Sequence, residues 1–258
     1  MKPNKPKVLF VDIETSPILG SVWALFDQNV GLNQIEKDWH VLSWAAKWAG
    51  EKDVMYMDQS RARKVEDDSF ILKGVWKLLD EAEVVIGQNS KRFDIKKLNA
   101  RFIINGMSPP SPFRQIDTLQ IAKKHFGFTS NKLEYMSGKL CPDEKKLTQR
   151  QFAGFELWKE CLAGNKAAWA EMRKYNIQDV IALEAVYNKL QPWDNATKIF
   201  SGTADSPRCN CGSYDLQRRG FNVTNLGKFQ RYQCQGCGAW YSDKDNLIPK
   251  EQRQSKLK

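Results

Sequence analysis

An apolar run near the start of the chain ends in two carboxylates. Residues 8–11 are Val-Leu-Phe-Val, and Asp12-Ile13-Glu14 follows them directly. Four apolar β-formers in a row predict a buried strand. Side chains two positions apart on a strand point to the same side, so we expect Asp12 and Glu14 to project together from the end of this strand.

Apolar segments with strand or helix spacing follow this first strand. Residues 39–48 and 53–57 are rich in aromatic and β-branched residues and predict two strands that form an antiparallel meander with the first. Residues 84–86, Val-Val-Ile, predict a short buried strand. Helical spacing predicts helices over 70–79, capped by Asp67-Asp68-Ser69, and over 90–103 and 119–126.

The longest helical pattern begins at Asn165 and stops before Pro192, and its Ala and Glu content supports a helix. Residues 130–164 predict short helices joined by loops. Strands first and helices later, with one βα unit between them, predict an α/β fold in which helices flank a sheet.

Charge and aromatic content point to a class of partner. The chain carries 40 Lys and Arg against 30 Asp and Glu, a formal net charge of +10, together with nine Trp, seven Tyr and thirteen Phe. Positive charge combined with stacking surface favours nucleic acid. Residues 201–258 contribute +5 of the excess and are therefore denser in positive charge. Lysines that only maintain solubility are the alternative explanation for the first 200 residues.

The apolar run at 8–11 is too short for a signal-peptide core or a membrane span, because Asp12 interrupts it. We therefore expect a cytosolic (cytoplasmic) protein with no membrane partner. Of six cysteines, Cys141 and Cys161 stand alone and the other four cluster near the C-terminus. In a reducing compartment, clustered cysteines favour metal binding over disulfides.

Three more positions extend the acidic pattern. Asp94 stands just past the strand at 84–86, in the first turn of a helix, and Tyr175 and Asp179 stand four apart on one face of the long helix. Taken singly, they are explained as a helix N-terminal acid, the edge of an amphipathic core and a surface charge. Asp117, just before the 119–126 helix, is best explained as an N-cap.

Taken together, these residues resemble the motifs of the DEDD 3′-5′ exonuclease superfamily. Val11-Asp12-Ile13-Glu14-Thr15 is similar to its first motif, Asn89 with Phe93-Asp94 to its second, and Tyr175-Asn-Ile-Gln-Asp179 to its third. Lys174 stands where one form of the third motif has His, so the tyrosine (DEDDy) branch is implied. Within the superfamily, the chain most resembles small exonucleases akin to the proofreading domain of family B DNA polymerases.

The resemblance implies a ribonuclease H-like fold, a mixed sheet flanked by helices, and hydrolysis assisted by two Mg²⁺ or Mn²⁺ ions. It implies that Asp12 holds both ions, that Glu14 and Asp179 hold the ion beside the attacking water, that Asp94 holds the leaving-group ion, and that Tyr175 orients the water. Hard oxygen ligands suit these ions, and two-metal sites space them about 3.5–4 Å apart.

The clustered cysteines form two knuckles, Cys209-Asn-Cys211 and Cys234-Gln-Gly-Cys237, separated by 22 residues. Four thiolates around one Zn²⁺ make a zinc ribbon, and a domain of about 40 residues needs such a structural metal to fold. The resemblance to zinc ribbons is closer at the second knuckle, because the first has the spacing Cys-x-Cys. Free or redox-active thiols are the alternative.

Basic and aromatic side chains are interleaved around the knuckles, which predicts a platform for phosphates and unstacked bases. A purely structural ribbon that docks on the nuclease or on another protein is the alternative. With two residues of the second motif, the predicted nucleic-acid contacts are Asn89, Phe93, Arg218, Arg219, Phe221, Lys228, Phe229, Arg231, Tyr232 and Trp240.

These interpretations divide the chain into a ribonuclease H-like exonuclease domain (1–198), a linker (199–207), a small β zinc-ribbon domain (208–246) and a flexible tail (247–258). They predict a monomeric 3′-5′ exonuclease that acts on single-stranded DNA in replication or repair. The same chemistry on RNA, or a non-catalytic nucleic-acid-binding accessory protein that recruits a polymerase, are the alternatives.

Overall fold

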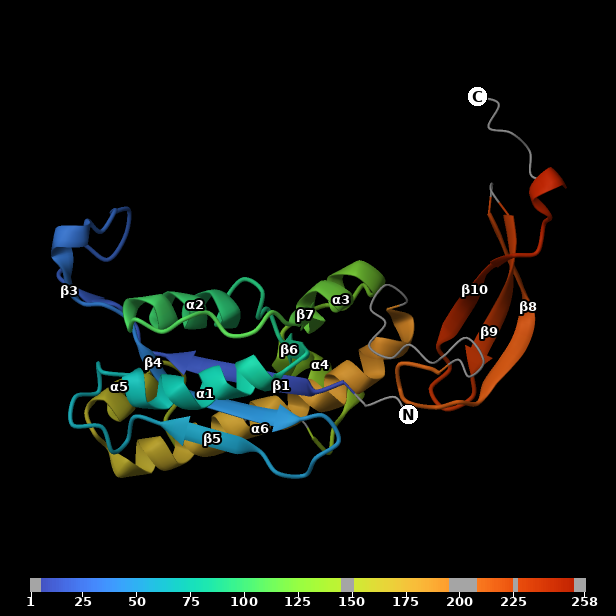
Figure 1. The fold of residues 1–258 in the computed structure, drawn as a ribbon. Helices are drawn as coiled ribbons and strands as arrows, with labels where there is room; N and C mark the ends of the chain where they lie inside the picture. The colour runs from blue at the N-terminus through green and yellow to red at the C-terminus, as the bar shows by residue number, and fades with distance from the viewer. Residues whose placement is uncertain (1–5, 145–150, 195–207, 225–226, 253–258) are drawn as a thin grey trace. The chain divides into compact units, whose positions relative to one another are not determined.

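The apolar run at the start of the chain forms β1 (Val8–Thr15), the middle strand of a five-stranded sheet (Figure 1). The computed structural model describes residues 6–144, 151–194, 208–224 and 227–252. The sheet has the order β5-β4-β1-β6-β7. Residues 8–11 are buried, as the apolar pattern predicted.

The sheet combines antiparallel and parallel pairs. β1 pairs antiparallel with β4 (Val41–Trp48), and β4 pairs antiparallel with β5 (Met55–Asp58). On its other side β1 pairs parallel with β6 (Val84–Gly87), which pairs parallel with β7 (Arg114–Asp117). The predicted meander and the mixed sheet are therefore confirmed.

Helices cover both faces of this sheet (Figure 1). On one face, α1 and α2 pack on the odd-numbered apolar residues of β1; on the other, α5 and α6 pack on Leu42. The α-helices among the described residues are α1 (Ser69–Glu81), α2 (Asp94–Ile104), α3 (Thr118–His125), α4 (Leu133–Leu140), α5 (Glu156–Leu162) and α6 (Lys166–Leu190). Short 3-10 turns span Leu32–Gln34, Gln191–Trp193 and Lys250–Gln252.

The structure gives Asp68, which was predicted to cap α1, a different hydrogen-bond partner. Asp68 stands at the N-cap position, but its side chain makes no capping hydrogen bond. The fully buried carboxylate instead accepts two hydrogen bonds from the Arg101 guanidinium, at 2.7 and 2.8 Å, and one from the Val41 N–H at 2.9 Å. A bidentate arginine from α2 is a stronger partner than the helix backbone, so Asp68 joins α1, α2 and β4.

A two-stranded hairpin, β2 (Leu19–Gly20) with β3 (Ile35–Lys37), follows β1 and was not predicted. The segment between its strands carries strongly exposed apolar side chains, including Trp23 at 96%, Leu25 at 85% and Phe26 at 80% exposure. These side chains do not contribute to the core.

The C-terminal region forms a separate antiparallel sheet of order β10-β9-β8. Its strands are β8 (Leu216–Thr224), β9 (Gly227–Cys234) and β10 (Trp240–Asn246). Gly220, with φ of +62°, lies where the β8–β9 register shifts. The small β region that the sequence predicted around the cysteines is therefore present.

The chain divides into two compact units, one made of residues 7–123 and 127–186, the other consisting mainly of residues from 187 onward. The predicted linker at 199–207 lies outside the described residues, as do residues 253–258 of the predicted tail. Within the described part of the chain, the helices lack the combination of length and apolarity that a membrane span requires.

Candidate functional site

Three of the predicted acids converge. Asp12 and Glu14 come from β1 and Asp179 from α6, and one carboxylate oxygen of each lies within 4.8 Å of the others. Asp179 is 3% exposed, whereas Asp12 and Glu14 are half-buried. The cluster therefore combines the strand end and the long helix that the sequence singled out.

The alternation of β1 places its carboxylates on the α6 side. Leu9, Val11 and Ile13 pack with α1 and α2, so the even-numbered Asp12 and Glu14 face the other way. A β-bulge near the end of β1 opposes Glu14 with Ser43 and Thr15 with Val41, leaving Leu42 as the extra residue. Bulges re-aim side chains near active sites. Here Leu42 packs against α6, and the Ser43 hydroxyl donates a hydrogen bond to Asn176 of α6.

Asn176 holds Asp12 in place. This fully buried amide donates from Nδ2 to Asp12 Oδ2 at 2.6 Å, and its Oδ1 accepts a hydrogen bond from the Ser43 hydroxyl at 3.0 Å. Sequence reasoning missed Asn176. Its only signal is its place directly after Tyr175 in the third motif, three residues before Asp179.

Asp94, the first residue of α2, lies against the same strand. Its Oδ1 accepts a hydrogen bond from the N–H of Ile13, the residue between Asp12 and Glu14, at 3.1 Å. Asp94 is not one of the three acids within 4.8 Å of one another. Burial is the main cause that raises the pKa of Asp94 to about 7; the Ile13 N–H opposes the shift and the Asp117 carboxylate adds to it.

Asp117 fixes the turn that leads to Asp94. Its Oδ1 accepts a hydrogen bond from the Leu119 N–H at 3.0 Å, which confirms it as the cap of α3. The same carboxylate accepts from the Asn89 N–H at 2.9 Å, and Asn89 has the left-handed φ of 60°. The backbone of Asn89 thus has a structural role, and Asp117 holds the second motif beside β1.

The two remaining motif side chains differ in exposure. Tyr175 is 8% exposed and packs with Leu157 and Met172. Its ring meets that of Trp158 edge to face, with 6.0 Å between the ring centres. Phe93 is 38% exposed, and this exposure leaves its ring available for contact with a ligand. The Lys97 ammonium lies 5.7 Å from the centre of the Phe93 ring.

The acidic cluster suits a hard divalent cation. Three carboxylates this close repel one another unless positive charge lies between them, and oxygen donors are the ligands that Mg²⁺ and Mn²⁺ prefer. Asn176 and Ile13 donate to Asp12 and Asp94, and fixing ligand carboxylates in this way is typical of metal sites. The residues present therefore fit divalent metal binding.

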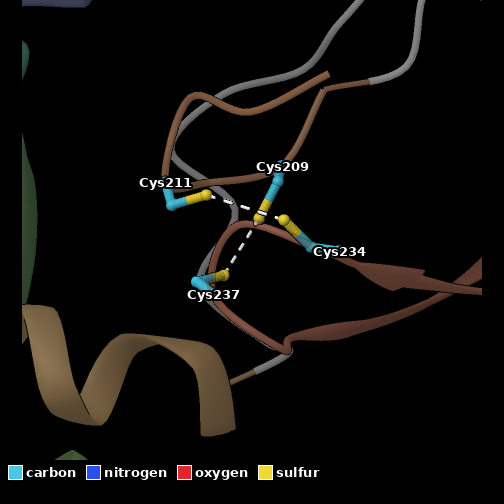
Figure 2. Close-up of side chains that lie close together, drawn as sticks. All are labelled: Cys209, Cys211, Cys234 and Cys237. Carbon is cyan, nitrogen blue, oxygen red and sulfur yellow. Dashed lines mark hydrogen bonds between the residues drawn. The ribbon is translucent and has the colours of Figure 1, made fainter. Parts of the chain in front are cut away.

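A second candidate metal site lies in the C-terminal unit. Figure 2 shows Cys209, Cys211, Cys234 and Cys237 pointing toward one another, with all four Sγ atoms within 4.8 Å. The Sγ–Sγ distances are 3.5 Å for Cys209–Cys237 and 3.7 Å for Cys211–Cys234. A disulfide needs about 2.0 Å. A tetrahedral site with Zn–S bonds of about 2.3 Å has edges of about 3.8 Å, so the cluster fits a zinc ribbon.

Backbone turns shape both knuckles despite their different spacing. Gly212 N–H donates to the Cys209 carbonyl and Gly238 N–H to the Cys234 carbonyl, each at 2.9 Å. Burial raises the pKa of Cys209 to about 11. Burial also acts to raise the pKa of Cys234, but hydrogen bonds, chiefly from the Cys237 N–H, lower it to about 7. A cation would favour the thiolate form at every position.

The predicted contact residues of the C-terminal sheet are partly paired with each other. The Lys228 ammonium lies 4.1 Å from the centre of the Phe221 ring, and the Arg231 guanidinium 4.7 Å from that of Trp240. The Tyr232 hydroxyl donates to Asp243 at 3.3 Å. Arg218 and Arg219 are exposed, Phe221 is 45% exposed and Phe229 is half-buried. The sheet thus presents cations and rings as stacked pairs.

The mixed sheet, with its two faces covered by helices and an acidic cluster at the end of its central strand, defines the ribonuclease H-like class of proteins. Residues 9–191 match the RNase_H superfamily, and the chain belongs to it. This membership supports a nuclease function in general.

Among solved structures, the fold is similar to the family B DNA polymerase from the hyperthermophilic archaeon Pyrobaculum calidifontis, with a TM-score of 0.54 and 18% sequence identity. The match covers 74% of this chain and 25% of the polymerase, so the chain corresponds to about a quarter of that protein. Comparison with curated proteins gives no match.

Proposed function

We propose that the protein is a metal-dependent 3′-5′ exonuclease of the tyrosine type that removes nucleotides from the 3′ end of single-stranded DNA. The observation that carries the proposal is the convergence of Asp12, Glu14 and Asp179 within 4.8 Å, with Asp94 hydrogen-bonded to the strand between the first two. The sequence resemblance of the three motifs supports the polarity.

Asp12, Glu14, Asp94 and Asp179 would hold two Mg²⁺ or Mn²⁺ ions. When bound, such ions activate a water molecule and stabilise the leaving oxygen of an in-line displacement. In the reaction, the water oxygen bonds to the phosphorus of the last phosphodiester and the P–O3′ bond breaks. The products are a nucleoside 5′-monophosphate and a strand one nucleotide shorter with a new 3′-hydroxyl.

Residues of the chain position these groups. Asn176 fixes the orientation of Asp12, and the Ile13 N–H fixes that of Asp94. Tyr175, four residues before Asp179, would orient the attacking water by a hydrogen bond. Phe93, at 38% exposure, would stack on the terminal base.

The four cysteines would hold one structural Zn²⁺, and the C-terminal sheet would help to hold the strand. Arg218 and Arg219 are exposed on β8 and would contact phosphates. The double variant Arg218→Gln with Arg219→Gln is therefore expected to bind single-stranded DNA more weakly, with a flatter salt dependence. Unchanged affinity would leave the ribbon as a purely structural domain.

The test uses oligonucleotides labelled at the 5′ end, incubated with Mg²⁺ or Mn²⁺. A descending ladder from DNA is expected with the wild type and with Asp53→Ala, which removes an exposed acid outside the cluster, and is expected to be lost with Asp12→Ala. Immediate release of short labelled products would indicate the opposite polarity, a ladder from RNA alone an exoribonuclease, and binding without shortening an accessory protein.

A further inference from the structure

A pocket lies on the same compact unit as the acidic cluster. This pocket has a volume of about 750 Å³ and is lined by the end of β5, the loop 59–67 that follows it, the first residues of α1, and Arg173 of α6. Neither the proposed metal ligands nor the predicted contact residues line it.

Positive charge dominates the lining. Arg61, Arg63, Lys64 and Arg173 are exposed there, and none of them takes part in an ion pair among the described residues. The two carboxylates of the lining are engaged locally, because Asp58 accepts hydrogen bonds from Ser60 and Asp67 accepts one from the Ser69 N–H. The four cations therefore outnumber the two carboxylates of the lining, and this excess of positive charge suits a polyanion.

Aromatic surface accompanies this charge. Phe70, at the start of α1, is 71% exposed although it is a large apolar side chain, and it lines the pocket. The centre of the Tyr56 ring lies 5.6 Å from the Arg173 guanidinium, and both residues line the pocket. Cations that follow a backbone beside rings that can stack on bases are the combination that binds single strands.

Strand register connects the pocket with the acidic cluster. Ser43 of β4 stands opposite Glu14 on one side and opposite Asp58 on the other, so these three residues lie in one row across the sheet. Directly paired residues point to the same face, and each strand spacing is about 4.8 Å. Asp58 of the pocket lining thus lies on the face that carries the acids, about two strand spacings, or roughly 10 Å, from Glu14. The pocket lies at the β5 edge of the sheet, between the first residues of α1 and Arg173 of α6.

We propose that this pocket binds the sugar-phosphate backbone of single-stranded nucleic acid, on the 5′ side of the nucleotide that is removed. The inference rests on the proposed function for its direction, but the binding itself does not require catalysis. Arg61 and Arg63 contact phosphates, and Phe70 stacks on a base.

The test measures binding to the full-length protein without divalent ions, so that no strand is cut. Fluorescence anisotropy of 5′-labelled dT20 and rU20 is followed over a series of KCl concentrations. Each phosphate contact contributes about 0.7 to the slope of log K against log salt for a single strand. Replacing two contacts, with Arg61→Gln and Arg63→Gln together, is expected to lower the slope by about 1.4.

The matched control removes the same charge from α1, with Lys73→Gln and Lys77→Gln, two exposed lysines outside the pocket. It is expected to keep the wild-type slope. If the pocket variant also keeps the wild-type slope with both oligonucleotides, the pocket does not bind the strand. An equal effect on dT20 and rU20 supports backbone recognition, whereas an effect on neither overturns it.

Failure of the proposed function is distinguished by the shortening assay, which compares wild type with Asp12→Ala in Mn²⁺. A wild type that shortens DNA, with a pocket variant of unchanged slope, refutes the pocket and leaves the exonuclease. A wild type that never shortens DNA, with a slope lowered in the pocket variant alone, refutes the exonuclease and leaves the pocket as a nucleic-acid site.

Discussion

Asn176 Nδ2 donates a hydrogen bond of 2.6 Å to Asp12 Oδ2, across 164 positions of sequence. The other end of the same amide accepts from Ser43, so one buried side chain joins α6, β1 and β4. A carboxylate that is to bind a cation gains from such a fixed orientation.

Replacing Asn176 with Ala is expected to lower nuclease activity about 10–100-fold and to raise the Mn²⁺ concentration needed for half-maximal rate. It also leaves the Ser43 hydroxyl buried without its partner, at a cost of about 1–3 kcal/mol in unfolding free energy. Metal titrations of the rate and denaturant unfolding measure the two effects. Ser43→Ala is the control, because it removes the other hydrogen bond of Asn176 and leaves that to Asp12. A metal dependence unchanged in Asn176→Ala contradicts the orienting role.

Gly87→Ala is expected to disturb the second motif. A Cβ at Gly87, the last residue of β6, would lie 2.7 Å from the Ser90 hydroxyl and 3.3 Å from the Val11 carbonyl. The turn before Asp94 must shift to admit it, so we expect a loss of about 1–3 kcal/mol in unfolding free energy and reduced activity. Gly138→Ala in α4 is the control, because its added Cβ has no atom within 4 Å outside its chain neighbours and its own helix backbone, and the variant is expected to gain about 0.5–1 kcal/mol. Equal effects of the two substitutions contradict this account.

Loss of the Asp68–Arg101 ion pair is expected to lower the unfolding free energy more than loss of an exposed ion pair. Asp68 is fully buried and Arg101 nearly so, and removing the acid leaves a charged guanidinium without its partner. Asp68→Ala is expected to cost about 3–5 kcal/mol. The exposed Lys37–Glu66 pair provides the comparison, since Glu66→Gln is expected to cost at most about 1 kcal/mol. Urea unfolding of both variants decides whether burial sets the difference.

Zinc binding is expected to depend on the four clustered cysteines and on no other cysteine. Purified protein should contain one zinc per chain, and Cys234→Ser should lose it and become sensitive to proteolysis within 208–252. Cys141→Ser is the control, because Cys141 is buried outside the cluster. Elemental analysis gives the stoichiometry. Zinc retained in Cys234→Ser, or absent from the wild type, argues against a zinc ribbon.

Much of the fold could be predicted because local patterns and tertiary structure agree. The alternation of β1 put Asp12 and Glu14 on one side, and helical spacing put Tyr175 and Asp179 on α6. The meander followed from strand patterns alone. The position of the acidic cluster then depends only on α6 packing against the face of β1 that carries Asp12 and Glu14.

Other features depend on partners far away in sequence. Asp68 reads as a cap, but Arg101 is the better partner for its carboxylate, and that partner exists only once α2 packs on α1. Asn176 reads as an ordinary helix residue until Asp12 reaches it. The pocket beside the loop at 59–67 also depends on a distant partner, because Arg173 of α6 is one of its lining residues.

The central claim is that the acids hold two divalent ions for hydrolysis at the 3′ end. Crystals soaked with Mn²⁺ and thymidine 5′-monophosphate test it most directly, through the anomalous signal of manganese. The account predicts two peaks about 3.5–4 Å apart, bounded by Asp12, Glu14 and Asp179, with one extending toward Asp94. Peaks elsewhere, or none between these acids in crystals of an active preparation, would contradict it.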